Sequence, residues 1–199
     1  ASSSSPRIGW WAWGWRWAGC KGPELADCLL TRLERAFPTA RLVHRLDRDT
    51  SGVMVFALTE HAQRHLGQQF EARKVKKTYV ARVTGQLEQK TGTVDLPLIV
   101  DWPNRPRQMV CHETGKPALT DWKVVKSDAG ESRVRLFPLT GRSHQLRVHM
   151  LSLGHPILGD PLYSDRAQDY PRMMLHAEEL RLTHPSEGRG LRQRVPAPF

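Results

Sequence analysis

Residues 53–58, Val53-Met54-Val55-Phe56-Ala57-Leu58, form an uninterrupted apolar run with the length of one β-strand. Such a run is typical of a strand that is covered on both faces of its sheet. Thr59, whose side chain suits a helix N-cap, follows at once, and Ala62, Leu66 and Phe70 then recur at helical spacing. This stretch therefore predicts a buried strand that leads directly into an amphipathic helix.

The sequence before this strand predicts one further helix. Leu25, Cys28, Leu29 and Leu33 fall at helical spacing, and Pro38 ends the pattern. We expect a short amphipathic helix here.

Residues 1–22 differ in composition from everything that follows. Five tryptophans are crowded behind a run of serines, at positions 10, 11, 13, 15 and 17. Alternation of Trp with Gly, Ala and Arg is compatible with a strand, and a non-native or disordered segment would look the same. We treat residues 1–22 as an atypical segment and expect one catalytic domain over residues 23–199.

After the first helices, short β-prone segments recur with turn signals between them. They cover residues 78–83, 93–100, 107–111, 119–126 and 132–139. Ser143 suits the cap of a later helix that carries Leu146, Met150 and Leu153, and residues 174–183 predict a late strand. Strands in runs with a few interspersed helices predict an α+β fold with a mostly antiparallel sheet and flanking helices.

The chain is basic, with 30 Lys and Arg against 20 Asp and Glu and a formal net charge of +10. This balance suits a polyanionic partner such as nucleic acid, although a merely solvated basic surface would have the same composition. An anionic membrane is the rival partner. No stretch reaches the roughly 18 apolar residues of a spanning helix, so we expect no membrane partner.

The cysteines and histidines do not predict a metal site. Cys20, Cys28 and Cys111 form no C-x-x-C or paired pattern, which suggests neither a disulfide framework nor a zinc site and favours a reducing, cytoplasmic setting. His144 and His149 are five residues apart and would not share a helix face. Glycine patterns for phosphate loops are also missing. We expect no metal and no cofactor.

Two segments place charged residues between apolar elements, where a packed core would not select them. In residues 44–52 a carboxylate, Asp47, stands just before the apolar strand. In residues 140–149 several cations stand at a predicted helix start, where backbone N–H groups favour anions. Together they would form an arginine-paired carboxylate in a basic cleft, and the residues alone leave an ordinary structural ion pair equally open.

At these residues the sequence resembles the RluA family of pseudouridine synthases. His44-Arg45-Leu46-Asp47 with Thr50-Ser51-Gly52 resembles the family's catalytic-aspartate motif, and Lys77-Thr78-Tyr79 resembles its tyrosine motif. Residues 140–147, Thr-Gly-Arg-Ser-His-Gln-Leu-Arg, resemble its arginine motif. The three motifs occur in the family's order, and the resemblance runs from about residue 23 to residue 199. It implies the pseudouridine synthase fold, with a central active-site cleft, and isomerisation of uridines in structured RNA without a cofactor.

The resemblance also implies roles for individual residues. Asp47 would be the essential carboxylate, acting as nucleophile at C1′ or as base at C2′ of the ribose. Arg142 would keep it ionised and oriented, and Tyr79 would pack on the base and assist the later loss of the C5 proton. Arg45 would help to extrude the target nucleotide, and Leu146 would form an apolar wall of the uracil pocket.

Further contacts to the RNA are expected from basic residues near these motifs. The expected RNA-binding residues are His44, Lys77, Arg105, Arg107 and Arg147, with Arg73, Lys74 and Lys76 as part of the same basic run. Residues 95–118 narrow the resemblance to family members that act on both a large-subunit rRNA hairpin and a tRNA anticodon stem-loop. We expect rRNA or tRNA as partner, no obligate protein partner, and a monomer.

One departure from the family pattern bears on the fold. Family members without an appended RNA-binding domain begin with a strand and a Lys-Pro loop beside the active site, and residues 1–22 show neither. We therefore expect an exposed sheet edge, unless another segment covers it. Two rival functions remain open: a non-catalytic RNA-binding protein or inactive homologue, and an N-glycosidase that releases uracil.

Overall fold

The computed structural model describes residues 9–11 and 28–199, and these divide into two compact units. The first unit comprises residues up to 76 and residues 178–196, and the second comprises residues 77–177 and 197–199. The chain crosses the boundary inside two strands, β5 (Lys76–Thr84) and β11 (Leu175–Thr183). One catalytic domain over residues 23–199 therefore stays a prediction.

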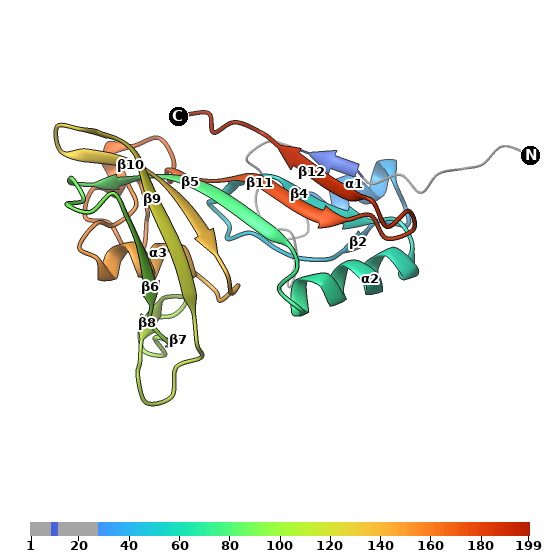
Figure 1. Cartoon of the computed structure of the whole chain (residues 1–199), viewed down its shortest axis with the longest axis horizontal. Helices are drawn as coiled ribbons and strands as arrows, with labels where there is room; N and C mark the ends of the chain where they lie inside the picture. The colour runs from blue at the N-terminus through green and yellow to red at the C-terminus, as the bar shows by residue number, and fades with distance from the viewer. Residues whose placement is uncertain (1–8, 12–27) are drawn as a thin grey trace, which may run out of the picture. The chain divides into compact units, whose positions relative to one another are not determined.

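The first unit is built around β4 (Met54–Ala57), the strand predicted from the apolar run. Antiparallel neighbours flank it on both sides, β1 (Gly9–Trp11) on one and β2 (Arg41–Leu42) on the other (Figure 1). Val55 and Ala57 pack with helix α2, whereas Met54 and Phe56 pack with helix α1. The alternating side chains of β4 thus enter two different core clusters, which confirms a strand buried on both faces.

The two helices of this unit begin near the predicted residues. α1 spans Leu29–Ala36, and α2 spans Glu60–Glu71. The Thr59 hydroxyl accepts a hydrogen bond from the Ala62 N–H at 3.1 Å, so the predicted cap is confirmed. Cys28, just before α1, is disulfide-bonded, contrary to the expectation from the cysteine spacing.

The expected exposed edge beside β4 is covered. β1 comes from the tryptophan-rich start of the chain and pairs with β4 from Gly9 opposite Phe56 to Trp11 opposite Met54. The possibility of a strand in this segment is therefore confirmed for residues 9–11. Predictions for the rest of residues 1–22 lie outside the described residues.

Besides β2, the first unit contains two further strands that the sequence did not predict. β3 (Ser51–Gly52) is short, and β12 (Gly190–Arg194) forms an antiparallel hairpin with β11. Arg194 and Arg192 of β12 form ion pairs with the buried carboxylates of Glu178 and Glu179, at 3.0 and 2.7 Å. Apolar contacts add to these ion pairs, because Leu191 of β12 pairs with Leu182 and packs against the same core cluster.

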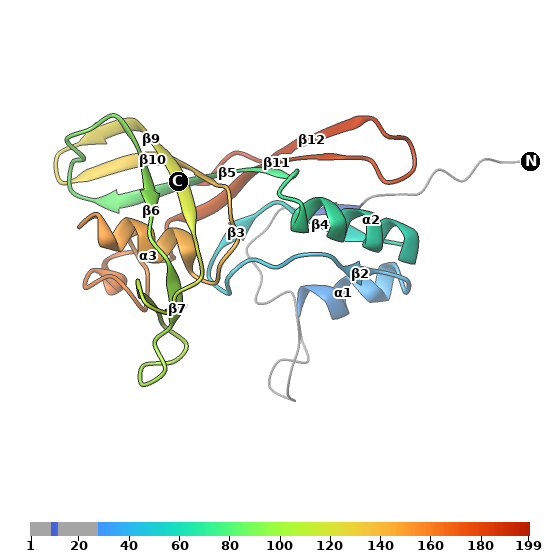
Figure 2. The ribbon, with the colours of Figure 1, turned by 60° about the horizontal axis from the view of Figure 1, so that its bottom comes forward.

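The second unit is an antiparallel sheet with helix α3 (Gln145–Ser152) on one face (Figure 2). Its strands lie in the order β5, β10, β9, β6. They span Glu131–Pro138 for β10, Leu119–Asp128 for β9 and Thr91–Asp95 for β6. A separate hairpin joins β7 (Leu98–Val100) to β8 (Gln108–Val110), and a 3₁₀ turn follows at Ala167–Asp169. These elements confirm the mostly antiparallel α+β prediction.

One predicted strand is two strands in the structure. Residues 93–100 are interrupted at Leu96 and Pro97, which separate β6 from β7. Pro97 has no N–H to continue a ladder, and the Leu96 N–H instead donates to the Ala118 carbonyl at 3.2 Å. The chain therefore leaves the main sheet and starts the β7–β8 hairpin.

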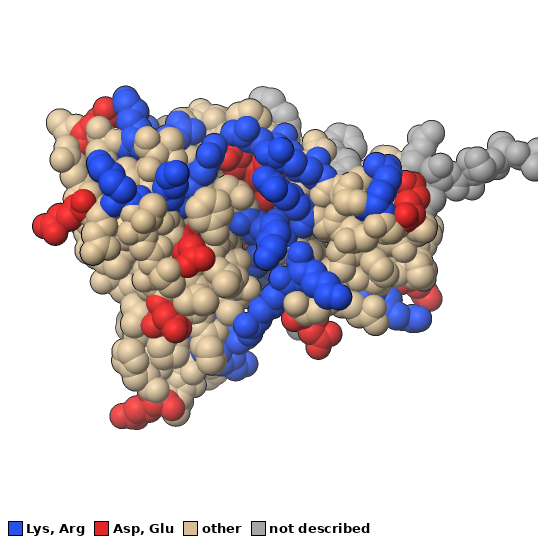
Figure 3. Space-filling model, viewed as in Figure 1, with Lys and Arg blue, Asp and Glu red and all other residues tan. Residues whose placement is uncertain are grey.

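The two faces of the β5–β10–β9 sheet differ in chemistry. Val134 and Leu136 alternate into the core with Leu146 and Met150 of α3. The side chains that alternate with Val134 and Leu136 point to the other face of the sheet. On that face, basic residues of neighbouring strands lie opposite one another. The pairs are Arg133 with Arg82, Arg133 with Lys126, and Arg135 with Lys123. Figure 3 shows basic side chains over this unit, so the chain's excess of cations is displayed partly on the outer face of this sheet.

Helix α3 is buried although it carries several polar side chains. His149 is fully buried and lies between two oxygens, the Thr120 hydroxyl at 2.9 Å from Nδ1 and the Leu96 carbonyl at 3.2 Å from Nε2. A carbonyl can only accept, so Nε2 carries the hydrogen and Nδ1 accepts from Thr120. Burial lowers the pKa of His149, and the ring is neutral in the folded protein.

This arrangement predicts a loss of stability on mild acidification. The lowered pKa keeps His149 neutral in the fold, whereas the unfolded chain takes up a proton below about pH 6.5, so stability is present above that pH and falls below it. Urea unfolding between pH 7.5 and 5.0 should show a decrease that is clearly smaller in His149→Gln. The exposed His112→Gln serves as control. Equal pH dependence in the parent and His149→Gln would contradict the assignment.

Within the part of the chain that the structure describes, no helix is long and apolar enough to cross a membrane.

Candidate active site

Asp47 lies in the first unit, in the loop between β2 and β3. His44 anchors this loop, because its Nε2 accepts a hydrogen bond from the Val55 N–H at 3.1 Å and its ring stacks on Phe70 at 4.7 Å between centroids. Those contacts join the loop to both β4 and α2. His44, expected to bind RNA, thus has a structural role in positioning Asp47, and any contact to RNA stays a prediction.

The residues after Asp47 form a tight turn that returns to the core. The Asp47 carbonyl accepts from the Thr50 N–H at 3.0 Å, and Thr50 and Ser51 are buried. The buried Thr50 hydroxyl has no hydrogen-bond partner among the described residues, and such a group commonly marks a strained or functional position. Asp47 itself is half-buried, and Arg45 is exposed. The loop therefore holds the Asp47 carboxylate on a backbone that is fixed to the core.

Gln145 organises the arginine motif in the second unit. Its Oε1 accepts from the Thr140 hydroxyl at 2.7 Å and from the Arg142 N–H at 3.0 Å. Its Nε2 donates to the Leu119 carbonyl at 3.0 Å and to the Thr120 hydroxyl at 2.9 Å. A single buried amide thus ties the loop that carries Arg142 to strand β9.

The start of α3 differs from the sequence prediction. Ser143 was the predicted cap, but the N-cap is His144, with a left-handed φ of 52° and no capping side chain. Its Nδ1 lies 2.8 Å from the Tyr163 hydroxyl, which holds the imidazole in place. A non-glycine residue in this conformation costs about 1 kcal/mol or more, and the surrounding contacts have to maintain it.

β5 carries the tyrosine motif beside this loop. The Lys77 ammonium donates to the Thr140 carbonyl at 3.0 Å. Tyr79 pairs in register with Leu136 of β10 and is half-buried against the core cluster of this unit. Lys77, expected to bind RNA, therefore also anchors the arginine loop, and the structure brings the tyrosine and arginine motifs together.

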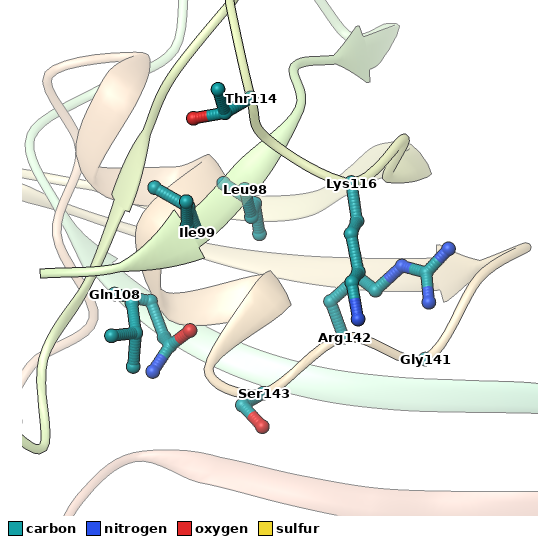
Figure 4. Close-up of a pocket in the computed structure, with 9 residues that line it drawn as sticks. Leu98, Ile99, Gln108, Thr114, Lys116, Gly141, Arg142 and Ser143 are labelled. Carbon is teal, nitrogen blue, oxygen red and sulfur yellow. The ribbon is translucent and has the colours of Figure 1, made fainter.

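Arg142 is half-buried at the edge of a pocket of about 440 Å³. Its Nε donates to the Pro117 carbonyl at 3.1 Å. Figure 4 shows Lys116 beside Arg142 on one side of the pocket and Gln108 on the other. Within the described residues no cluster of three or more His, Cys, Asp or Glu could hold a metal ion.

A carboxylate on an anchored loop, a tyrosine beside apolar side chains, and an arginine held by an amide network are groups that can act on the sugar and base of a nucleotide. Residues 24–152 match the family model described as RNA pseudouridylate synthase. The chain belongs to this family.

The relatives of this family member include curated bacterial proteins. It is 53% identical over 182 residues to the dual-specificity RNA pseudouridine synthase RluA of Yersinia pestis, covering 90% of this chain and 88% of that protein. It is 56% identical over 180 residues to the RluA of Escherichia coli K12, covering 88% and 82%. The high identity supports the reaction class: this pseudouridine synthase is an isomerase that converts uridine to pseudouridine in RNA.

Solved structures agree with the fold. The human RNA pseudouridylate synthase domain containing 1 matches with a TM-score of 0.76 at 35% identity, over 86% of this chain and 75% of that one. The human domain containing 4 matches with a TM-score of 0.72 at 27% identity, over 96% and 85%. The pseudouridine synthase fold predicted from the motifs is therefore confirmed.

Arg147, predicted to bind RNA, has a different role. Its side chain is 3% exposed and forms a bidentate ion pair with Asp160, with Nε and Nη2 at 2.7 and 2.6 Å from the two carboxylate oxygens. Asp160 also accepts from the backbone N–H groups of Leu162 and Tyr163. The head group of Arg147 is engaged inside the protein, which gives this residue a structural role, and its contact to RNA stays a prediction.

The other predicted residues keep their predicted roles as proposals. Leu146 is buried in the core cluster of the second unit. Arg105 is exposed near the tip of the β7–β8 hairpin, and its guanidinium stacks 4.0 Å over the Trp102 ring. Arg107 is half-buried, 5.2 Å from the Tyr163 ring centroid. The sequence assigned no organising role to Gln145, Asp160 or Tyr163, although Gln145 stands inside the arginine motif and residues 155–160 also resemble a family segment.

The buried pair predicts that Arg147→Met loses stability rather than RNA affinity. Removing one partner of a buried ion pair lowers the free energy of unfolding by about 3–5 kcal/mol, because Asp160 is left charged in the interior. Arg107→Met is the matched control and should change stability by about 0.5 kcal/mol or less. Urea unfolding measures both. Full stability of Arg147→Met, together with a weaker salt dependence of RNA binding, would instead support Arg147 as an RNA ligand.

Proposed function

We propose that Asp47 is the catalytic carboxylate of this pseudouridine synthase, with Arg142 as its charge partner and Tyr79 against the target base. The observation that carries the proposal is the anchoring of each motif: His44 holds the loop of Asp47, and Gln145 holds the loop of Arg142. Catalysis by positioning requires such rigid supports.

In this mechanism Asp47 acts on the ribose of a flipped uridine, as nucleophile at C1′ or as base at C2′. The glycosidic bond breaks, the uracil turns within its pocket, and a bond forms from C1′ to C5. The proton on C5 is then lost and N1, freed from the ribose, takes up a proton, so the product is an isomer of the substrate. Arg142 stabilises the ionised form of Asp47, and Arg45 assists the extrusion of the nucleotide.

We also propose two RNA substrates for the chain, a large-subunit rRNA hairpin and a tRNA anticodon stem-loop. The support is the 53–56% identity to relatives named dual-specificity RNA pseudouridine synthases. Phosphate contacts from Arg73, Lys74, Lys76, Lys77 and the hairpin arginines Arg105 and Arg107 would supply affinity that depends on salt. The enzyme acts as a monomer, which sedimentation at assay concentration tests, and a cytoplasmic location stays a prediction.

Asp47→Asn tests the central assignment. With an RNA hairpin that contains 5-tritiated uridine, we expect the parent to release tritium and the variant to be slower by about 10²–10⁴-fold, the usual effect of losing a catalytic acid or base. Asp49→Asn, in the same loop, should stay close to the parent. Tritium release that survives Asp47→Asn would overturn the assignment. Labelled free uracil would identify a glycosidase, and RNA binding without either product would identify a non-catalytic binder.

Tyr79→Phe separates binding from the last step. The substitution keeps the aromatic face and removes only the hydroxyl, so RNA affinity should be unchanged while tritium release falls by about 100-fold. Tyr170→Phe in the same unit is the matched control. Parallel measurement of RNA affinity and tritium release distinguishes the two effects. A variant that loses affinity but keeps its rate on bound RNA would show that Tyr79 only binds.

A further inference from the structure

The pocket beside Arg142 is formed by two separate parts of the second unit. β7 and β8 contribute Leu98, Ile99, Val100 and Gln108, and the loop after β8 contributes Thr114 and Lys116. The arginine loop contributes Gly141, Arg142 and Ser143. The pocket therefore adjoins the loop that carries the proposed catalytic arginine. No residue of the tyrosine motif is among the residues that line the pocket.

The lining has three chemical zones. Leu98 is buried, with Ile99 beside it at the centre of the view in Figure 4, so that β7 supplies an apolar wall. Gln108, Thr114 and Ser143 supply amide and hydroxyl groups around the wall. Lys116 and Arg142 supply two positive charges, and no Asp or Glu is among the lining residues.

This combination suits one unpaired nucleotide of an RNA. A base can lie with its face on the apolar wall and its edge toward the amide and hydroxyl groups, while its phosphate lies near the two cations. A volume of about 440 Å³ falls in the usual range of about 300–1,000 Å³ for small-molecule pockets. A bare phosphate would use the cations but would leave the apolar wall exposed.

We propose that this pocket binds a second nucleotide of the RNA loop, one that neighbours the target uridine, and so helps to select the substrate. The inference rests on the proposed function, because it assumes that the target uridine is bound near Arg142. A loop that must place two unstacked nucleotides at once is recognised by its shape and flexibility as well as by its sequence.

The test combines pocket-filling variants with altered RNA. Thr114→Trp fills the pocket from its exposed side, and Met109→Trp, on β8 and 43% exposed, is the matched control that does not line it. The substrate is a 5-tritiated-uridine hairpin in which each loop nucleotide other than the target is made abasic in turn. An abasic nucleotide keeps the phosphate and removes only the base, so it distinguishes a base pocket from a phosphate site.

For the parent and Met109→Trp we expect one abasic position to lower kcat/KM for tritium release by about tenfold, the lower end of base-stacking effects. Thr114→Trp should be about tenfold slower on intact RNA and should lose nothing further from that abasic substitution, since the two changes remove the same contact. Parental activity of folded Thr114→Trp, or losses that multiply at every abasic position, would overturn the proposal.

A second pair of variants guards against a folding defect. If thermal unfolding shows that Thr114→Trp is not folded, Lys116→Gln replaces it, with the exposed Lys90→Gln as control. Lys116→Gln should weaken binding of intact and abasic RNA and reduce its salt dependence by about one phosphate contact, whereas an effect equal to that of Lys90→Gln would overturn the proposal. Absence of tritium release from the parent would overturn the proposed function itself. Tritium release by the parent, without the expected coupling between the pocket variant and one abasic position, would overturn only the proposal for the pocket.

Discussion

The buried side-chain amide of Gln145 is the contact on which the arginine loop of this enzyme depends. It accepts from Thr140 and the Arg142 N–H and donates to Leu119 and Thr120, so all its hydrogen-bonding capacity is used inside the protein. Removing it would leave several buried donors and acceptors without partners, each at a cost of about 1–3 kcal/mol. The position of the Arg142 backbone is therefore coupled to the packing of α3 on the sheet.

The aspartate loop in the first unit is also held by a polar side chain, that of His44. β4 is covered on both faces and is among the most buried elements described, with Val55 and Phe56 at 0% and 1% exposure. The Val55 N–H donates its hydrogen bond to the His44 imidazole. A backbone hydrogen bond of a rigid strand thus fixes the loop that carries Asp47. In both units a functional loop is held by one polar side chain at the margin of an apolar core.

The parts of the fold that follow local patterns could be predicted from the sequence. The apolar run of residues 53–58 and the cap at Thr59 each determine structure within a few residues. β12 could not be predicted, because Leu191 is the one apolar residue in its Gly-Leu-Arg-Gln-Arg sequence. The strand pairs with β11 through contacts that include ion pairs to Glu178 and Glu179. Pairing with residues distant in the sequence leaves no local signal.

Arg147 shows why a sequence motif does not distinguish residues that bind RNA from residues that stabilise the fold. It stands in the arginine motif two residues after Gln145, and a cation in a basic segment suggests a phosphate contact. Its partner, Asp160, lies 13 positions further along the chain. Nothing in residues 140–149 indicates that this guanidinium is buried. Charge predicts affinity for RNA only for side chains that reach the surface, and burial is a property of the whole fold.

The concentration of buried polar groups around α3 has a physical consequence for function. Gln145, Arg147 and His149 are all buried on one short helix, and each is hydrogen-bonded. Apolar side chains of similar volume would often be as stabilising or more so, so stability alone does not explain them. A satisfied polar network differs from an apolar cluster because its hydrogen bonds have direction and permit few alternative arrangements. The left-handed His144, held by the Tyr163 hydroxyl, belongs to the same network.

The network therefore limits the movement of the helix start, and Arg142 and Ser143 can present their side chains to RNA from a fixed position. The basic outer face of the sheet attracts RNA over long distances without such precision. Selection of one uridine requires the short-range order, and this order is maintained by side chains that are buried in the second unit.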